Sequence, residues 1–142
     1  MSAFLTPLKV MPLPDGRTWE LCEGFSYYTG NAASDFLISV PAGFVTDFAS
    51  VPRILWWLLP PWGRYGKAAV IHDWLYKSKP WSRRRCDSIF LEGMKVLGVS
   101  WATRTTMYGA VRAFGWLPWG KTKAAPERAG ITPRVWTDSP DE

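Results

Sequence analysis

Hydrophobic residues in the first fifty positions occur in short runs that are separated by turn residues. The runs contain apolar, β-branched or aromatic side chains and cover residues 8–11, 18–22, 25–28 and 36–40. Between them lie Asp15-Gly16, Glu23-Gly24 and Gly30-Asn31, which are residue pairs typical of turns. Short extended segments joined by turns predict a small antiparallel β-meander in the N-terminal part of the chain.

After position 50 the spacing of hydrophobic residues becomes helical. Ser50 can cap a helix, and Val51-Pro52 after it suits a first helical turn, where proline is tolerated. Ser82 and Ser100 are predicted N-caps of later helices. The predicted helical half contains three to four helices, over about residues 51–59, 64–77, 82–96 and 100–116. Strands followed by helices indicate the α+β class.

The length of 142 residues suits one domain with its own hydrophobic core. We expect a single α+β domain over residues 1–120. After Gly120 the composition changes to Pro, Ala and scattered charge, which predicts a flexible or docking C-terminal tail over residues 121–142. No uncharged apolar run reaches about 18 residues, so no transmembrane segment is predicted. The first residues also lack the basic start and apolar core of a signal peptide.

Positive charge is concentrated in the middle of the chain. The net charge is +5, and the segment from Arg53 to Lys95 contains nine basic and three acidic residues. This excess favours an anionic partner, such as phospholipid headgroups, whereas nucleic acid is disfavoured because no recognised binding module accompanies the charge. Residues 83–85 are all arginine in a predicted first helical turn, where the helix dipole disfavours cations. That placement hints at a nearby anion.

The sequence contains ten tryptophans, eight of them between residues 56 and 119. Indole rings are favoured where one side is apolar and the other is wet, as at a membrane surface. We therefore expect Arg53, Trp56, Trp57 and Arg64 to contact an anionic lipid surface or a partner protein. The alternative is that most of the tryptophans are core residues, and the sequence leaves both interpretations open.

The candidate chemistry centres on His72, the only histidine of the chain, which lies in a largely apolar run. Asp87 follows fifteen residues later on the next predicted helix, and the short link of residues 77–82 makes the two helices antiparallel neighbours. The contact between these two helices is otherwise mostly apolar, so the His72 imidazole and the Asp87 carboxylate would each need a polar partner there. Each is the obvious partner of the other. A histidine held by a carboxylate is suited to general-base catalysis. A buried pair that only locks two helices is the alternative.

Asp73 and Asp47 are candidate metal ligands. Asp73 is turned about 100° away from His72 round the helix, and with Asp47 and backbone carbonyls it would suit calcium. The alternatives are a turn or cap role for Asp47 and, for Asp73, an ion pair with Lys77, at i+4, or with Arg64 or Lys67.

Other metal and phosphate chemistries are disfavoured by the sequence. One histidine and two distant cysteines exclude a conventional zinc cluster, and there is no Gly-rich phosphate loop. Cys22 and Cys86 lie in segments that look buried, so we expect them to be small apolar core residues and not a disulfide.

Two long blocks of sequence resemble a family of short phage and prophage proteins that form a domain of unknown function. The blocks are VPAGFVTDFASVPR at residues 40–53 and AAVIHDWLY at residues 68–76, and the resemblance covers about residues 5–115. It implies a phage origin, with the protein in the host cytoplasm or in the virion. It brings no established activity.

A more distant resemblance connects the predicted helix pair to the catalytic helices of secretory phospholipase A2. It rests on His72-Asp73-x-x-Tyr76 and on the later Asp87-x-x-Phe90. The resemblance implies that His72 activates a water for attack on a lipid ester, that Asp87 orients the histidine, and that Tyr76 supports this network. It also implies that Asp73 binds calcium, although the chain lacks the family's flanking cysteines and its Gly-rich calcium loop.

Two functions follow as expectations. The first is a phage-encoded, phospholipase A2-like protein in which a His–Asp pair hydrolyses lipid esters, with Ca²⁺ as the candidate cofactor. The second is a non-catalytic structural protein of the phage virion or tail, or a protein that engages a host target.

Overall fold

The computed structural model describes residues 3–4, 7–16, 18–31, 34–46, 65–120 and 130–133. Antiparallel strands come first and helices follow, which confirms the α+β class. The predicted helix over residues 51–59 lies outside the described residues. So do five of the candidate site residues, namely Asp47, Arg53, Trp56, Trp57 and Arg64.

The predicted N-terminal antiparallel strands are present, and they are divided between two sheets. One sheet has the order β1 (Ala3–Phe4), β4 (Phe25–Asn31), β5 (Ser34–Val40), β7 (Ile131–Pro133), and the other has the order β2 (Val10–Pro12), β3 (Trp19–Leu21), β6 (Val45–Thr46). The chain bends between β3 and β4, so β3 pairs with β2 and β6 and not with β4, the next strand in sequence. Hydrogen bonds from Gly43 N to Leu21 O and from Leu21 N to Phe44 O bring the chain back to β3.

Part of the predicted tail belongs to the first sheet. β7 pairs antiparallel with β5, with Ile131 opposite Ile38. Just before it, Ser39 N donates to Gly130 O over 2.9 Å. Three residues of the tail therefore dock on the chain's own sheet, whereas residues 121–129 and 134–142 lie outside the described part.

The helices follow the predicted ranges closely. They are α1 (Gly66–Ser78), α2 (Arg83–Val96), α3 (Trp101–Phe114) and the short α4 (Trp116–Gly120). Ser82 accepts from the backbone N–H of Arg85 and Ser100 accepts from that of Thr103, which confirms both predicted N-caps. Among the helices in the described residues, none has the length and apolar character needed to cross a bilayer.

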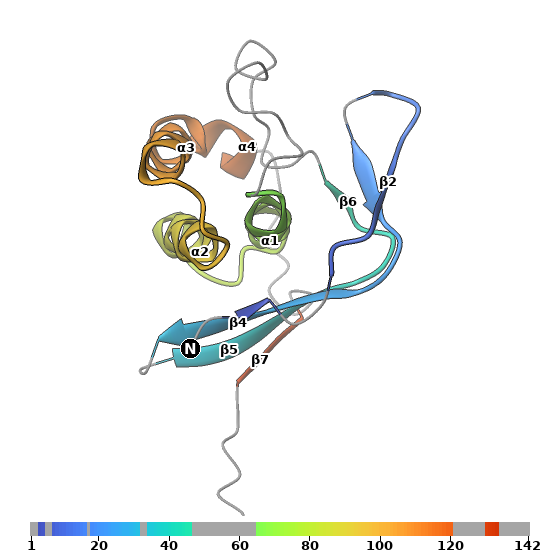
Figure 1. The fold of residues 1–142 in the computed structure, drawn as a ribbon, viewed down its shortest axis with the longest axis horizontal. Coiled ribbons are helices and arrows are strands. Elements are labelled where there is room, and N and C mark those ends of the chain that lie inside the picture. Colours follow the sequence, from blue (N-terminus) through green and yellow to red (C-terminus); the bar gives the residue numbers. More distant parts are fainter. Residues whose placement is uncertain are drawn as a thin grey trace, which may run out of the picture.

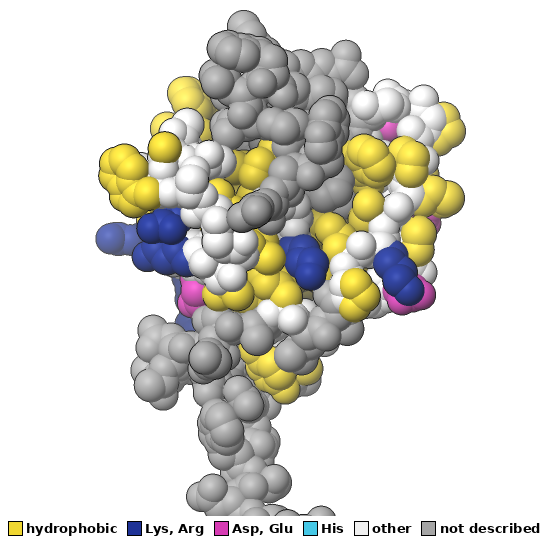
Figure 2. Space-filling model, in the orientation of Figure 1, with side chains coloured by type: hydrophobic (Ala, Val, Ile, Leu, Met, Phe, Trp, Pro, Cys, Tyr) yellow, Lys and Arg dark blue, Asp and Glu magenta, His cyan; other side chains and the backbone are white. Residues whose placement is uncertain are grey.

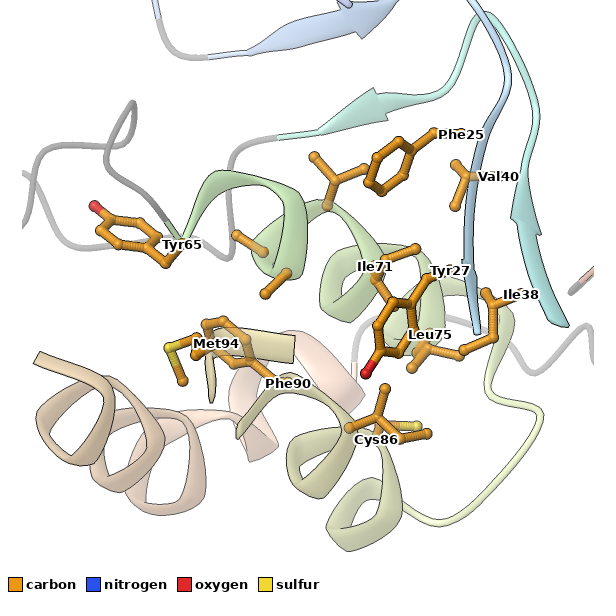
Figure 3. Packing of buried hydrophobic residues seen from close by; sticks show 14 of the residues in the cluster. Phe25, Tyr27, Ile38, Val40, Tyr65, Ile71, Leu75, Cys86, Phe90 and Met94 are labelled. Carbon is orange, nitrogen blue, oxygen red and sulfur yellow. The ribbon is translucent and has the colours of Figure 1, made fainter. Parts of the chain in front are cut away.

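The core surrounds α1, which lies between the β4–β5 hairpin and the other helices (Figure 1). Ten of its thirteen residues are buried. Ile71 and Leu75 lie toward Tyr27 and Ile38 of the sheet, and Phe90 fills the α2 side (Figure 3). A helix enclosed in this way carries its polar side chains into the core as well.

Candidate functional site

The site is centred on His72 of α1 and Asp87 of α2. His72 Nε2 lies 2.7 Å from Asp87 Oδ1. Only four residues, 79–82, connect the two helices, which places the side chains level with each other as the link length predicted. The residues are 3 % and 0 % exposed respectively, so the pair is enclosed by the fold.

Tyr76 completes one side of this pair. Its hydroxyl donates to the same Asp87 Oδ1 over 2.5 Å. Its ring and that of Phe90 both contact the imidazole, with centroids 4.2 Å and 4.6 Å from that of His72. Burial, followed by the hydrogen bond to Asp87, raises the pKa of Tyr76 well above its usual value, so the hydroxyl stays a donor. The imidazole is thus fixed by two aromatic rings and one carboxylate oxygen.

Two arginines that the sequence analysis did not assign to the site hold the other oxygen of Asp87. Arg112 Nη1 of α3 lies 2.8 Å from Asp87 Oδ2, and Arg83 Nη1 lies 3.5 Å from it. Burial raises the pKa of the Asp87 carboxyl, but the hydrogen bonds from His72, Tyr76 and Arg112 outweigh it, and the net pKa is lowered. Asp87 is therefore ionised at neutral pH.

The arginines differ in how far the sequence pointed to them. Arg83 stands at i−4 from Asp87 and in a first helical turn where a cation is disfavoured, so the anion hinted at by the sequence is Asp87 itself. Arg112 is 25 residues away on another helix, and no local pattern connects it to Asp87.

The geometry assigns one tautomer to the neutral imidazole. A carboxylate can only accept, so Nε2 must carry the proton and Nδ1 must carry the lone pair. No hydrogen bond joins Nδ1 to any residue that the structure describes. Only 4 % of the His72 side chain is exposed, because α1 is central in the fold. Access of water to Nδ1 stays a prediction.

The described part of the chain does not fit a calcium site. Asp73 is 8 % exposed, and its Oδ2 lies 3.5 Å from Lys77 Nζ, which is the i+4 ion pair that the sequence left open. Within the described ranges no group of three or more His, Cys, Asp or Glu residues could hold a metal ion. Asp47, the other candidate ligand, lies outside them. Calcium binding stays a prediction.

The two cysteines are free and have different environments. Cys86 is buried as predicted, and burial raises its pKa to about 12. Cys22 is exposed, so the prediction of a buried position there was wrong. Neighbouring residues of a strand face opposite sides, and Leu21 takes the inward position at this end of β3.

Exposed aromatic residues lie on α3 and at the start of α4. Trp101, Phe114 and Trp116 are 71 %, 68 % and 59 % exposed. Figure 2 shows hydrophobic side chains beside Lys and Arg side chains over the α2 and α3 part of the surface. Trp74 and Trp119, in contrast, pack against the core, so the described tryptophans include both core and exposed residues, and lipid or partner contact stays a prediction.

The comparisons with known proteins identify a family but no activity. Residues 19–111 match the family described as "Protein of unknown function (DUF1353)". The chain is also 33 % identical over 99 residues to the uncharacterized protein y4jT of Sinorhizobium fredii; the match covers 68 % of this chain and 29 % of that protein. No solved structure matches the chain. Because the family match includes His72, Tyr76 and Asp87, the site lies within its bounds, and the chain belongs to the DUF1353 family of unknown function.

Proposed function

We propose that the chain hydrolyses lipid esters by general-base catalysis with His72 as the base. The observation that carries this proposal is the arrangement of the imidazole. Nε2 donates to Asp87, and Nδ1 has no hydrogen-bond partner among the described residues. A fixed imidazole with one free lone pair is what a general base requires.

In this mechanism Nδ1 removes a proton from a water molecule while the water oxygen attacks the ester carbonyl carbon. The C–O bond to the alcohol then breaks, and the imidazolium returns the proton to the leaving oxygen. Asp87 stabilises the imidazolium through Nε2, and Tyr76 keeps that carboxylate oxygen in place. Since the His72 side chain is 4 % exposed, the mechanism requires the ring to become accessible when lipid binds.

Lipid is the substrate class that the surface favours. Trp101, Phe114 and Trp116 are exposed on α3 and α4, and residues 101–120 include no Asp or Glu. The net charge of +5 adds attraction to anionic headgroups. Aromatic rings next to cations suit the interface of an anionic bilayer.

The test is fatty acid release from phosphatidylglycerol vesicles, with calcium or with a chelator. The wild type should release fatty acid, and the His72→Gln variant should lose about a hundredfold or more of the rate, as expected for removal of a general base. Ser88→Ala, an exposed change on α2 that alters no charge, is the matched control and should behave as the wild type. Activity that depends on calcium would support Asp47 and Asp73 as calcium ligands. Full activity in the presence of chelator would contradict that role. No fatty acid in either condition contradicts the proposal.

The burial of His72 favours a second candidate function, that of a non-catalytic protein of a phage virion or tail, or one that engages a host target. Here the His72–Asp87 pair only fixes α1 against α2. Diethyl pyrocarbonate separates the two functions, because His72 is the only histidine. Modification that proceeds only at the rate of unfolding supports the second function, and modification that vesicles accelerate supports the first. Copurification with virions would support the second function independently.

A further inference from the structure

Arg112 connects the third helix to the carboxylate that orients His72. We infer that Arg112 is a positioning residue, which fixes the Asp87 carboxylate so that a single oxygen, Oδ1, faces His72 and Tyr76. The inference concerns the same site as the proposed function, and its activity readout rests on that function. Its spectroscopic readout does not.

The two oxygens of Asp87 have separate partners. Oδ1 accepts from His72 Nε2 and from the Tyr76 hydroxyl, at 2.7 Å and 2.5 Å. Oδ2 accepts from Arg112 Nη1 at 2.8 Å. Arg112 is fixed on α3 and cannot follow the Asp87 side chain of α2. If that side chain turned to another rotamer, the contact to Arg112 would therefore break. The contact therefore selects one rotamer of Asp87, and with it one position for the Nε2 proton.

Arg112 is itself held in place by Arg83. The Arg83 guanidinium donates to Val111 O at 3.0 Å and, through both Nη atoms, to Arg112 O at 3.3 Å. Both carbonyls lie in the last turn of α3, and Val111 O also accepts from the backbone N–H of Gly115 at 2.9 Å. Arg83 thus caps the end of α3 at the residue that contacts Asp87.

The chain beyond Arg112 also fits closely against the site. A Cβ at Gly115 would overlap the backbone carbonyl oxygen of Val111 and lie 2.5 Å from Tyr76 Oη, so only glycine fits there. Trp119 of α4 then contacts the Tyr76 ring, with centroids 5.1 Å apart. The C-terminal end of α3 therefore contacts the residues around Asp87 in three ways. These are the Arg112 side chain, the backbone carbonyls of Val111 and Arg112, and the turn at Gly115.

The experiment uses the imidazole ¹⁵N signals, which belong to His72 alone because the chain has one histidine. In the wild type the neutral ring should be the Nε2–H tautomer, with that proton protected from exchange. Arg112→Gln should populate the second tautomer and speed exchange of the Nε2 proton by about tenfold or more. Arg112→Lys keeps the charge and should recover part of the protection.

Arg104→Gln is the matched control, since Arg104 also lies on α3 but donates to Val99 O and not to Asp87. It should leave both signals unchanged. In the ester assay, Arg112→Gln should lower kcat by about tenfold to a hundredfold with little change in KM. If folded Arg112→Gln keeps the wild-type tautomer of His72 and the wild-type exchange rate of the Nε2 proton, the inference is overturned. If Arg112→Gln does not fold, Arg112→Met takes its place, and wild-type protection of the Nε2 proton in that variant overturns the inference. Absence of esterase activity in the wild type would contradict the proposed function but leave the ¹⁵N result decisive for Arg112.

Discussion

Asp87→Asn is the substitution that perturbs the largest number of contacts in the site with the smallest change in shape. The amide oxygen of asparagine can still accept from His72 and Tyr76 in place of Oδ1. Its NH₂ group then takes the place of Oδ2 and points a donor at the guanidinium of Arg112. The variant therefore replaces one charge-assisted hydrogen bond by two opposed donors in a fully buried position.

The magnitude follows from the burial of the two partners. A hydrogen bond to a charged group contributes about 1.5–3 kcal/mol, and removing one partner of a buried ion pair costs about 3–5 kcal/mol. The side chain of Arg112 is 33 % exposed, so its guanidinium regains part of its hydration when the carboxylate is lost. We therefore expect the free energy of unfolding to fall by about 2–4 kcal/mol, which corresponds to a Tm lowered by roughly 10 °C.

The assay is urea unfolding of the wild type and the variant, repeated from neutral to acidic pH. The pKa of Asp87 is lowered in the folded state, so its contribution is fully present above the unfolded value of about 3.9. That contribution is lost as the pH falls through the folded pKa. The stability difference between the proteins should therefore shrink below about pH 4. A difference under about 1 kcal/mol at neutral pH, or one that persists unchanged in acid, would refute the reasoning.

A double-mutant cycle isolates the contact itself. If Asp87 and Arg112 act on each other as described, the losses in Asp87→Asn and Arg112→Gln should fall short of additivity in the double variant by about 1–2 kcal/mol. If the losses in free energy of unfolding are additive, Asp87 and Arg112 do not stabilise each other.

Two glycine substitutions test the close contacts around the site and the sheet. Gly115→Ala should destabilise the fold by about 1–3 kcal/mol in thermal unfolding, since its Cβ would lie 2.5 Å from Tyr76 Oη; an unchanged Tm would contradict this packing. Gly130→Ala combines a φ of 63° with a Cβ that would overlap Ser39 O, so β7 should leave β5. Hydrogen exchange at the Ser39 amide should then speed up by about tenfold or more, and retained protection would show that β7 stays bound.

The sequence was sufficient for those parts of the fold that local interactions determine. Ser82 and Ser100 cap helices because their side chains accept from a backbone N–H three residues on, which is visible in sequence. The His72–Asp87 contact followed from the length of the link between two helices. Both inferences needed only neighbouring residues.

The parts that the sequence did not predict depend on contacts between distant segments. Pairing of β3 with β6 in place of β4 is decided by how the chain returns after β5, and no turn residue specifies it. The contact of Arg112 with Asp87 requires the position of α3, which the helix patterns do not define. The burial of His72 did have a sequence indication. Four consecutive apolar residues, 68–71, cover every side of a helix, whereas an amphipathic helix presents one apolar stripe.

The choice between a helix lock and a general base depends on the nitrogen of His72 that faces away from Asp87. A lock requires only that buried polar atoms find partners, and Asp87 meets this condition at both oxygens. Nδ1 has no partner among the described residues, and an unsatisfied buried acceptor costs about 1–3 kcal/mol. A pair selected for stability alone gains nothing from that atom, while a base requires it. Under the proposed function, Nδ1 is the atom that takes a proton from water, so uptake of a proton from solvent at Nδ1 is the measurement that separates a base from a lock.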